Sequence, residues 1–254
     1  MFKILSLKAQ IAMLATMALL GILTLAGIQL LSDAQRSHAL ERRDQAIATN
    51  DQIKDMQYDF LNARRHEKDF LMRKDMKYAA QHGETMATME ANIAALSDSP
   101  VATDLTSFGG LLAAYDQQFL KLVADWQTVG LDEKSGLLGT LRASVHKVEE
   151  ALQAYDDKNL AILMLMMRRH EKDFLARIDA KYVADIEVRQ KEFEQELERS
   201  SMDAAARKSL SDLIADYVAS FKALAEIRLQ LVDEEKVLSQ RFAEAQPPLD
   251  KATA

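Results

Sequence analysis

The sequence contains no cysteine, only three prolines and eight glycines, and a single tryptophan among its 254 residues. The absence of cysteine excludes a disulfide framework and any site built on a thiolate. The scarcity of glycine and proline, beside abundant Ala, Leu, Glu, Lys, Gln and Met, predicts an all-α fold. A net charge of −7 without a concentrated basic stripe argues against nucleic acid as a partner. Since no phosphate loop, zinc spacing or nucleophile–base constellation occurs either, we expect neither an enzyme nor a bound cofactor.

A long uncharged stretch lies near the N-terminus, at residues 11–31, and Lys3 and Lys8 precede it. About 20 apolar residues span a bilayer, and the two lysines place residues 1–10 in the cytoplasm. A cleaved signal peptide is the alternative, although its apolar region is ordinarily about 7–15 residues long. We therefore expect a transmembrane helix at 11–31, a domain outside the cytoplasm at 32–250, and a short tail at 251–254. For a bacterial protein the helix is an inner-membrane anchor and the domain is periplasmic.

One octapeptide occurs twice in the sequence. Residues 64–71 and 168–175 both read Arg-Arg-His-Glu-Lys-Asp-Phe-Leu. The match extends further along the chain, pairing Arg73 with Arg177, Asp75 with Asp179, and Lys77-Tyr78 with Lys181-Tyr182. A self-match of this length indicates two copies of one helical unit, about a hundred residues apart.

The repeated glutamate falls in the middle of an apolar seam when each octapeptide is placed on a helix. A bare carboxylate there is costly, so Glu67 and Glu171 need donors, from the arginine three residues earlier or from the adjacent histidine. We expect a polar layer between two bundles that fixes their register, formed by Arg64, His66, Glu67, Arg168, His170 and Glu171. A di-metal site is a more specific alternative. Adjacent His and Glu side chains, however, point about 100° apart around a helix, so we expect no metal.

The breaks in the helical pattern predict the order of the helices. We expect helices at 34–96, 101–128, 133–155, from 160 to 199, and from 203 onward, with a soft join at Val232-Asp233 and an end before Pro247-Pro248. The first of these would be roughly 90 Å long. These lengths predict two stacked four-helix bundles that share two long helices: a proximal bundle at about 35–65, 133–168 and 233–248, and a distal bundle at about 66–129 and 169–231.

The duplicated block, the Gly-Leu-Asp-Glu-Lys-Ser-Gly-Leu-Leu-Gly-Thr-Leu-Arg run at 130–142 and the preceding apolar segment resemble the helical bimodular sensor domain of bacterial methyl-accepting chemotaxis receptors and sensor kinases. The resemblance covers about residues 35–250. It implies a membrane-proximal pocket for organic acids such as citrate-cycle intermediates, and a distal pocket for a smaller acid such as acetate. It also implies a homodimer that passes a small helix displacement across the membrane. The family's second membrane helix, HAMP linker and signalling coil do not follow, so we expect either a truncated receptor or a free-standing anchored sensor domain.

Two sets of polar residues are candidates for ligand binding. Polar positions on the inner face of the first helix, with basic residues of the third and last helices, are expected to converge on a proximal carboxylate pocket: Arg42, Gln45, Thr49, Arg142, His146 and Arg241. In the alternative, these arginines extend into water or pair with Glu149 and Glu234. Four inward tyrosines are candidates for presenting hydroxyls to a small acid in the distal bundle, although packing in its core is the favoured interpretation: Tyr78, Tyr115, Tyr182 and Tyr217.

These observations favour a chemoreceptor domain that binds small organic acids and signals by helix displacement. The closest alternative is the input domain of a sensor kinase, on whose distal tip a periplasmic binding protein docks. A helical spacer without a ligand and a di-metal bundle are the alternatives from other classes.

Overall fold

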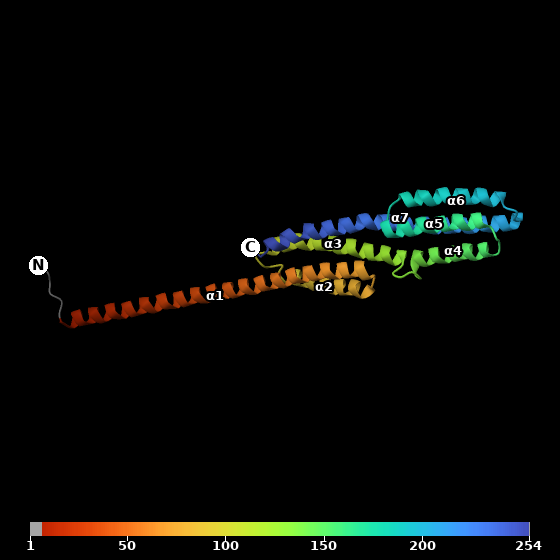
Figure 1. Ribbon diagram of the computed structural model, residues 1–254. Helices are drawn as coiled ribbons and strands as arrows, with labels where there is room; N and C mark the ends of the chain where they lie inside the picture. The colour runs from red at the N-terminus through yellow and green to blue at the C-terminus, as the bar shows by residue number, and fades with distance from the viewer. Residues whose placement is uncertain (1–6, 254) are drawn as a thin grey trace. The chain divides into compact units, whose positions relative to one another are not determined.

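The computed structural model describes residues 7–253, and these residues form helices joined by short turns, with no strand among them (Figure 1). The helices are α1 (Leu7–Arg73), α2 (Met76–Ala95), α3 (Ala102–Val129), α4 (Gly136–Gln153), α5 (Lys158–Arg177), α6 (Lys181–Arg199) and α7 (Ala204–Lys251). The predicted all-α class is therefore confirmed.

Contacts divide the chain into two units, with the boundary between Asp55 and Met56 inside α1. In the first unit the large apolar side chains between Ile11 and Leu31 are exposed. This part of α1 is long and apolar enough to cross a membrane by length and composition, a test that a signal sequence also passes. Lys3, on which part of the orientation prediction depends, lies outside the described residues.

The helices of the second unit make two sets of contacts. The first helix group consists of α1 from Met56, α2, α3 and the C-terminal half of α7, where the Phe60 and Phe242 rings stack with centroids 4.3 Å apart. The second helix group consists of α4, α5, α6 and the N-terminal half of α7, where Phe174 packs edge-on against Phe221 at 5.3 Å. Helix α7 therefore takes part in both groups, and α4 follows α3 from one group into the other (Figure 1).

This grouping differs from the expected division of the chain. Residues 133–168 were expected to pack with 35–65 and 233–248, whereas α4 contacts α5 and α7, and the octapeptide helix α5 contacts α6 and the first half of α7. The reason is that two helices turn back earlier than expected. Each copy of the repeat forms a tight helical hairpin, α1–α2 in the first copy and α5–α6 in the second, so each copy stays within its own group.

The two hairpin turns are themselves duplicated. Lys74 and Ile178 have positive φ angles of 53° and 50°, a conformation that residues with a Cβ rarely adopt. In each turn the next aspartate accepts a hydrogen bond from a lysine backbone N–H two residues on, at 3.0 Å for both Asp75 and Asp179. The prediction of unbroken helices at 34–96 and up to 199 is therefore wrong. The breaks were not evident in the sequence, because neither turn contains the glycine or proline that usually marks one.

The predicted break after α3 is confirmed. Gly130 and Gly136 have φ angles of 110° and 55°, and a Cβ at Gly130 would lie 2.2 Å from the Ser135 carbonyl oxygen. The join at 232–233 and the end before Pro247 are wrong, since α7 continues through both to Lys251. Buried Leu231, Leu238 and Leu249 run along α7 through this region, so tertiary packing outweighs the hydrogen bonds that the two prolines cannot donate.

Candidate functional site

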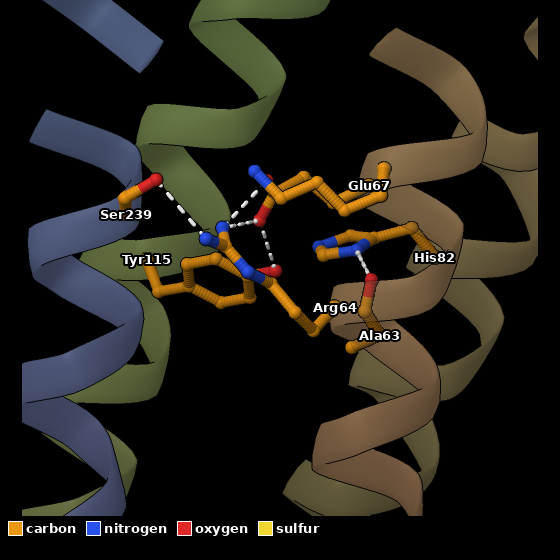
Figure 2. A network of polar contacts seen from close by, with 7 residues as sticks. Ala63, Arg64, Glu67, His82, Tyr115 and Ser239 are labelled. Carbon is orange, nitrogen blue, oxygen red and sulfur yellow. Dashed lines mark hydrogen bonds and ion pairs between the residues drawn. The ribbon is translucent and has the colours of Figure 1, made fainter. Parts of the chain in front are cut away.

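The repeated carboxylate Glu67 lies at the centre of a buried network in the first helix group (Figure 2). Arg64 Nη1 lies 2.6 Å and 2.5 Å from the two carboxylate oxygens, and the Tyr115 hydroxyl donates to Oε2 at 2.7 Å. Arg64 Nη2 also donates to Ser239 Oγ at 3.0 Å, which connects α1 to α7. Glu67 is 0% exposed, so these donors replace the water that the carboxylate loses on folding.

The second copy builds a corresponding network around Glu171, which is 2% exposed. Arg168 pairs with this carboxylate, Lys172 Nζ lies 3.2 Å away, and the Tyr217 hydroxyl donates to it at 3.1 Å. Of the two donors expected for each glutamate, the arginine three residues earlier pairs with it in both copies.

Both network tyrosines remain neutral donors. Burial raises the pKa of the Tyr115 phenol, and the negative charge of Glu67 raises it further. Burial and the charge of Glu171 raise the pKa of Tyr217 in the same way. Each hydroxyl therefore keeps its proton for the carboxylate and is not free to dissociate.

The two networks do not form the expected layer between bundles. Each stays inside its own helix group, and the histidines take no part in either. His66 is half-buried, and burial followed by the charge of Arg65 lowers its pKa. His170 faces Asp185 of α6, with Nδ1 3.5 Å from the carboxylate. The register-fixing layer is thus replaced by two separate carboxylate centres.

A cavity of about 260 Å³ opens beside the second network, between α4 and α5. Its lining is formed by Glu133, Leu138, Leu141, Arg142, His146, Arg168, Glu171, Lys172 and Leu175. Four of these side chains are basic and two are acidic. Arg168 pairs with Glu171 and lies 3.5 Å from Glu149, which is also 3.4 Å from His146, so Arg142 and Lys172 carry the remaining positive charge. The arrangement suits a small anion, because guanidinium and ammonium groups bind a carboxylate while the leucines cover its carbon chain.

The structure brings only two of the six expected proximal residues to this cavity, namely Arg142 and His146. Arg241 lies in the first helix group and pairs with Glu244 at 3.1 Å, so the expected convergence of Arg142 and Arg241 is wrong. Arg42 and Gln45 are exposed on the first unit, and Thr49 there is half-buried. Their exposure agrees with the alternative in which such side chains extend into water.

The four candidate tyrosines belong to different helix groups and form no common pocket. Tyr115 and Tyr217 are fully buried and donate to the two glutamates. The hydroxyl of Tyr182 accepts a hydrogen bond from Arg177 at 2.6 Å, and the half-buried ring of Tyr78 packs 5.7 Å from the Arg73 guanidinium. Core packing, the interpretation that the sequence favoured, therefore describes them better than a ligand site does.

One fully buried polar residue is not evident from the sequence pattern. His82 of α2 is 0% exposed, with Nδ1 3.1 Å from the Ala63 carbonyl oxygen and Nε2 3.3 Å from Asp116 Oδ1. It shares a helical face with buried Met86 and Met89, and that spacing is the signal that could have revealed it. Its imidazole links α1, α2 and α3.

Within residues 7–253, no group of three or more His, Cys, Asp or Glu side chains is arranged to hold a metal ion. Comparison with models of protein families finds none that matches this chain, and comparison with curated proteins finds no match either. The function is therefore inferred from the residues of the chain and their geometry.

Proposed function

We propose that this protein senses small organic-acid anions as the extracytoplasmic domain of a membrane-anchored receptor of the chemotaxis type. The observation that carries the proposal is the cavity between α4 and α5, where Arg142, His146, Arg168 and Lys172 surround a space of about 260 Å³. Ligand pockets are typically about 300–1,000 Å³, so this one suits a molecule of a few carbon atoms.

The arrangement of the helices is consistent with two stacked four-helix bundles. Each helix group contains four helical segments, α7 contributes to both, and the α3–α4 pair forms the second long element. The resemblance of the repeat to helical bimodular sensor domains implies the same architecture. We propose that the first helix group is the membrane-proximal bundle, since its α1 continues from the apolar segment.

The second network offers a route from the cavity to α7. Arg168 and Glu171 line the cavity, and Glu171 accepts a hydrogen bond from Tyr217 of α7. An anion that binds Arg168 competes with Glu171 for the guanidinium, and Glu171 then depends more on the hydrogen bond that it already accepts from Tyr217. A ligand that favours one packing of α5 against α7 shifts the population toward it, and α7 carries the displacement to the other helix group.

The setting we propose is the periplasm, with α1 as an inner-membrane anchor and the chain paired with a second copy. This proposal draws on the apolar segment of α1 and on the resemblance, in which two copies transmit a helix displacement through the membrane. The partners are then a small organic acid, the lipid bilayer and an identical subunit.

Calorimetric titration of the full chain in detergent micelles tests the proposal, with acetate, succinate, malate and citrate as probes. Arg142→Ala and His146→Ala should weaken binding of the best acid by about ten- to a hundredfold, because each removes a charge-assisted hydrogen bond worth about 1.5–3 kcal/mol. Arg169→Ala is the matched control, since this exposed arginine does not line the cavity and should bind like the wild type.

The same titration examines the first unit. Arg42→Ala should leave binding unchanged, because the cavity lies wholly within the second unit. If the four acids bind and only Arg42→Ala abolishes the binding, the anion site belongs to α1. If none binds, the domain does not sense these acids.

A second hollow favours a different function. The turns α4–α5 and α6–α7 surround a cavity of about 670 Å³ that is lined by residues 154–159 and 200–202. These turns form one end of the second helix group, where a periplasmic binding protein would dock in a sensor-kinase input domain. A chain that ignores all four acids, yet binds such a protein and loses that binding in Asp156→Ala, would have this function.

A further inference from the structure

The duplication allows the two carboxylate networks to be compared residue by residue. The run Leu131-Asp132-Glu133 before α4 resembles Val232-Asp233-Glu234 in α7. Continued along the helices, this register pairs Leu138 with Ser239 and Leu141 with Phe242. Ser239 and Phe242 are the α7 residues in contact with Arg64, and Leu138 and Leu141 line the cavity with Arg168. The register therefore gives Arg64 and Arg168 corresponding neighbours, although these neighbours follow the other octapeptide in sequence. Each network is named after its octapeptide, so the first copy means the network around Glu67 and the second copy means the network around Glu171.

In the first copy the space beside the arginine is filled by Phe242. Its ring stacks on Phe60 with an interplanar angle of 8°, and its centroid lies 5.7 Å from that of Tyr115. The Arg64 guanidinium lies over the same ring, 4.9 Å from its centroid. A cation on an aromatic face is already partly compensated, and the ring excludes an incoming anion.

In the second copy the corresponding position is Leu141, and an open cavity remains next to Arg168. Two basic residues of that cavity, Arg142 and His146, also have no basic counterpart in the first copy. In the same register, Arg142 corresponds to Ala243 and His146 to Pro247. The first copy thus has neither the space nor the additional positive charge that an anion requires.

We propose that the two copies have diverged into a closed centre around Glu67 and an open, anion-binding centre around Glu171, with Phe242 as the side chain that closes the first. The chain then binds one small carboxylate and not two. This inference rests on the proposed function. It adds the number of sites and the residue that determines which copy binds.

A reciprocal pair of substitutions tests the inference on the full chain in detergent. Leu141→Phe places the closing ring in the open copy, and Phe242→Leu removes it from the closed copy. Calorimetric titration with acetate, succinate, malate and citrate measures the number of sites, and circular dichroism with thermal melting shows that each variant is folded. Leu138→Phe is the second closing variant, because Leu138 is less buried than Leu141 and tolerates a larger ring more easily.

The wild type is expected to bind one equivalent of its best acid. Leu141→Phe, or Leu138→Phe if the former does not fold, should weaken that binding at least tenfold. Phe242→Leu should keep the first site and gain a weaker second one, particularly for acetate, the smallest probe.

Two outcomes overturn the inference and leave the proposed function intact. One is a wild type that binds two equivalents. The other is a single site that persists in both closing variants while Phe242→Leu gains nothing. A wild type that binds none of the four acids overturns the proposed function and this inference together.

Discussion

Replacing Tyr115 with phenylalanine removes one hydroxyl from the closed centre and leaves the ring in place. That hydroxyl donates at 2.7 Å to Glu67, and both residues are 0% exposed. In the variant, Arg64 still serves both carboxylate oxygens. The substitution therefore removes one donor from a buried anion without opening a cavity of any size, which makes its cost easy to interpret.

The expected cost follows from the charge of the acceptor. A hydrogen bond to a charged group contributes about 1.5–3 kcal/mol, and no water can replace the missing donor at a fully buried oxygen. We expect Tyr115→Phe to lower the free energy of unfolding by about 2 kcal/mol. For a chain of this length that corresponds to a decrease of about 4–8 °C in Tm.

The duplication supplies the matched control, Tyr217→Phe. The Tyr217 hydroxyl lies farther from its carboxylate, at 3.1 Å, and Glu171 borders the open cavity. Water that enters the cavity can serve Glu171, so we expect this variant to lose about 1 kcal/mol or less. Urea denaturation of the full chain in detergent, followed by circular dichroism, measures both values against the wild type.

A loss below about 0.5 kcal/mol in Tyr115→Phe would show that the hydroxyl does not stabilise the buried carboxylate, since surface substitutions commonly fall in that range. A larger loss in Tyr217→Phe than in Tyr115→Phe would contradict the distinction between a closed and an open centre. Equal losses near 2 kcal/mol in both would mean that water does not reach Glu171.

Three further predictions follow from other parts of the structure. Burial lowers the pKa of Lys74 to about 8, and its Nζ lies 3.4 Å from the ring centroid of Trp126, the only tryptophan. The fluorescence of Trp126 should therefore titrate near pH 8 in the wild type and not in Lys74→Met. At pH values between the folded pKa of Lys74 and its ordinary pKa, the unfolded chain binds more protons than the folded chain. The free energy of unfolding should therefore increase as the pH rises through that interval. Urea denaturation at a series of pH values should show this increase in the wild type and not in Lys74→Met. Asp203 accepts from the Ala206 N–H at 2.8 Å as the N-cap of α7, so Asp203→Ala should cost about 1 kcal/mol in thermal unfolding while Asp203→Asn costs almost nothing.

Part of the site was predictable from the sequence because it depends on local spacing. An arginine three residues before a glutamate lies on the same side of a helix wherever that helix packs, so the Arg64–Glu67 and Arg168–Glu171 pairs could be anticipated. The inward direction of Tyr115 and Tyr217 follows from the same periodicity. Arg142 and His146, one turn apart on α4, were likewise expected to face a common ligand site, and they line the same cavity.

The convergence of residues from distant helices was not predictable in this way. Whether Arg241 joins Arg142 depends on where α5 turns back, and that turn is made by Ile178 in a left-handed conformation that its side chain disfavours. Such a backbone conformation persists only because the packing of the surrounding helices stabilises it. The same holds for His82, whose partners lie on α1 and α3.

The sequence by itself determined that the chain is helical, that one unit occurs twice, and that each copy buries a carboxylate beside an arginine, because composition and periodicity act over a few turns of helix. The tertiary structure alone decided that the copies differ. Phe242 lies over Arg64, while the space beside Arg168 remains open, and this contrast depends on which face of α7 or α4 meets the octapeptide helix. Helical periodicity defines a face of each helix, whereas contacts between residues far apart in the sequence select the partner of that face.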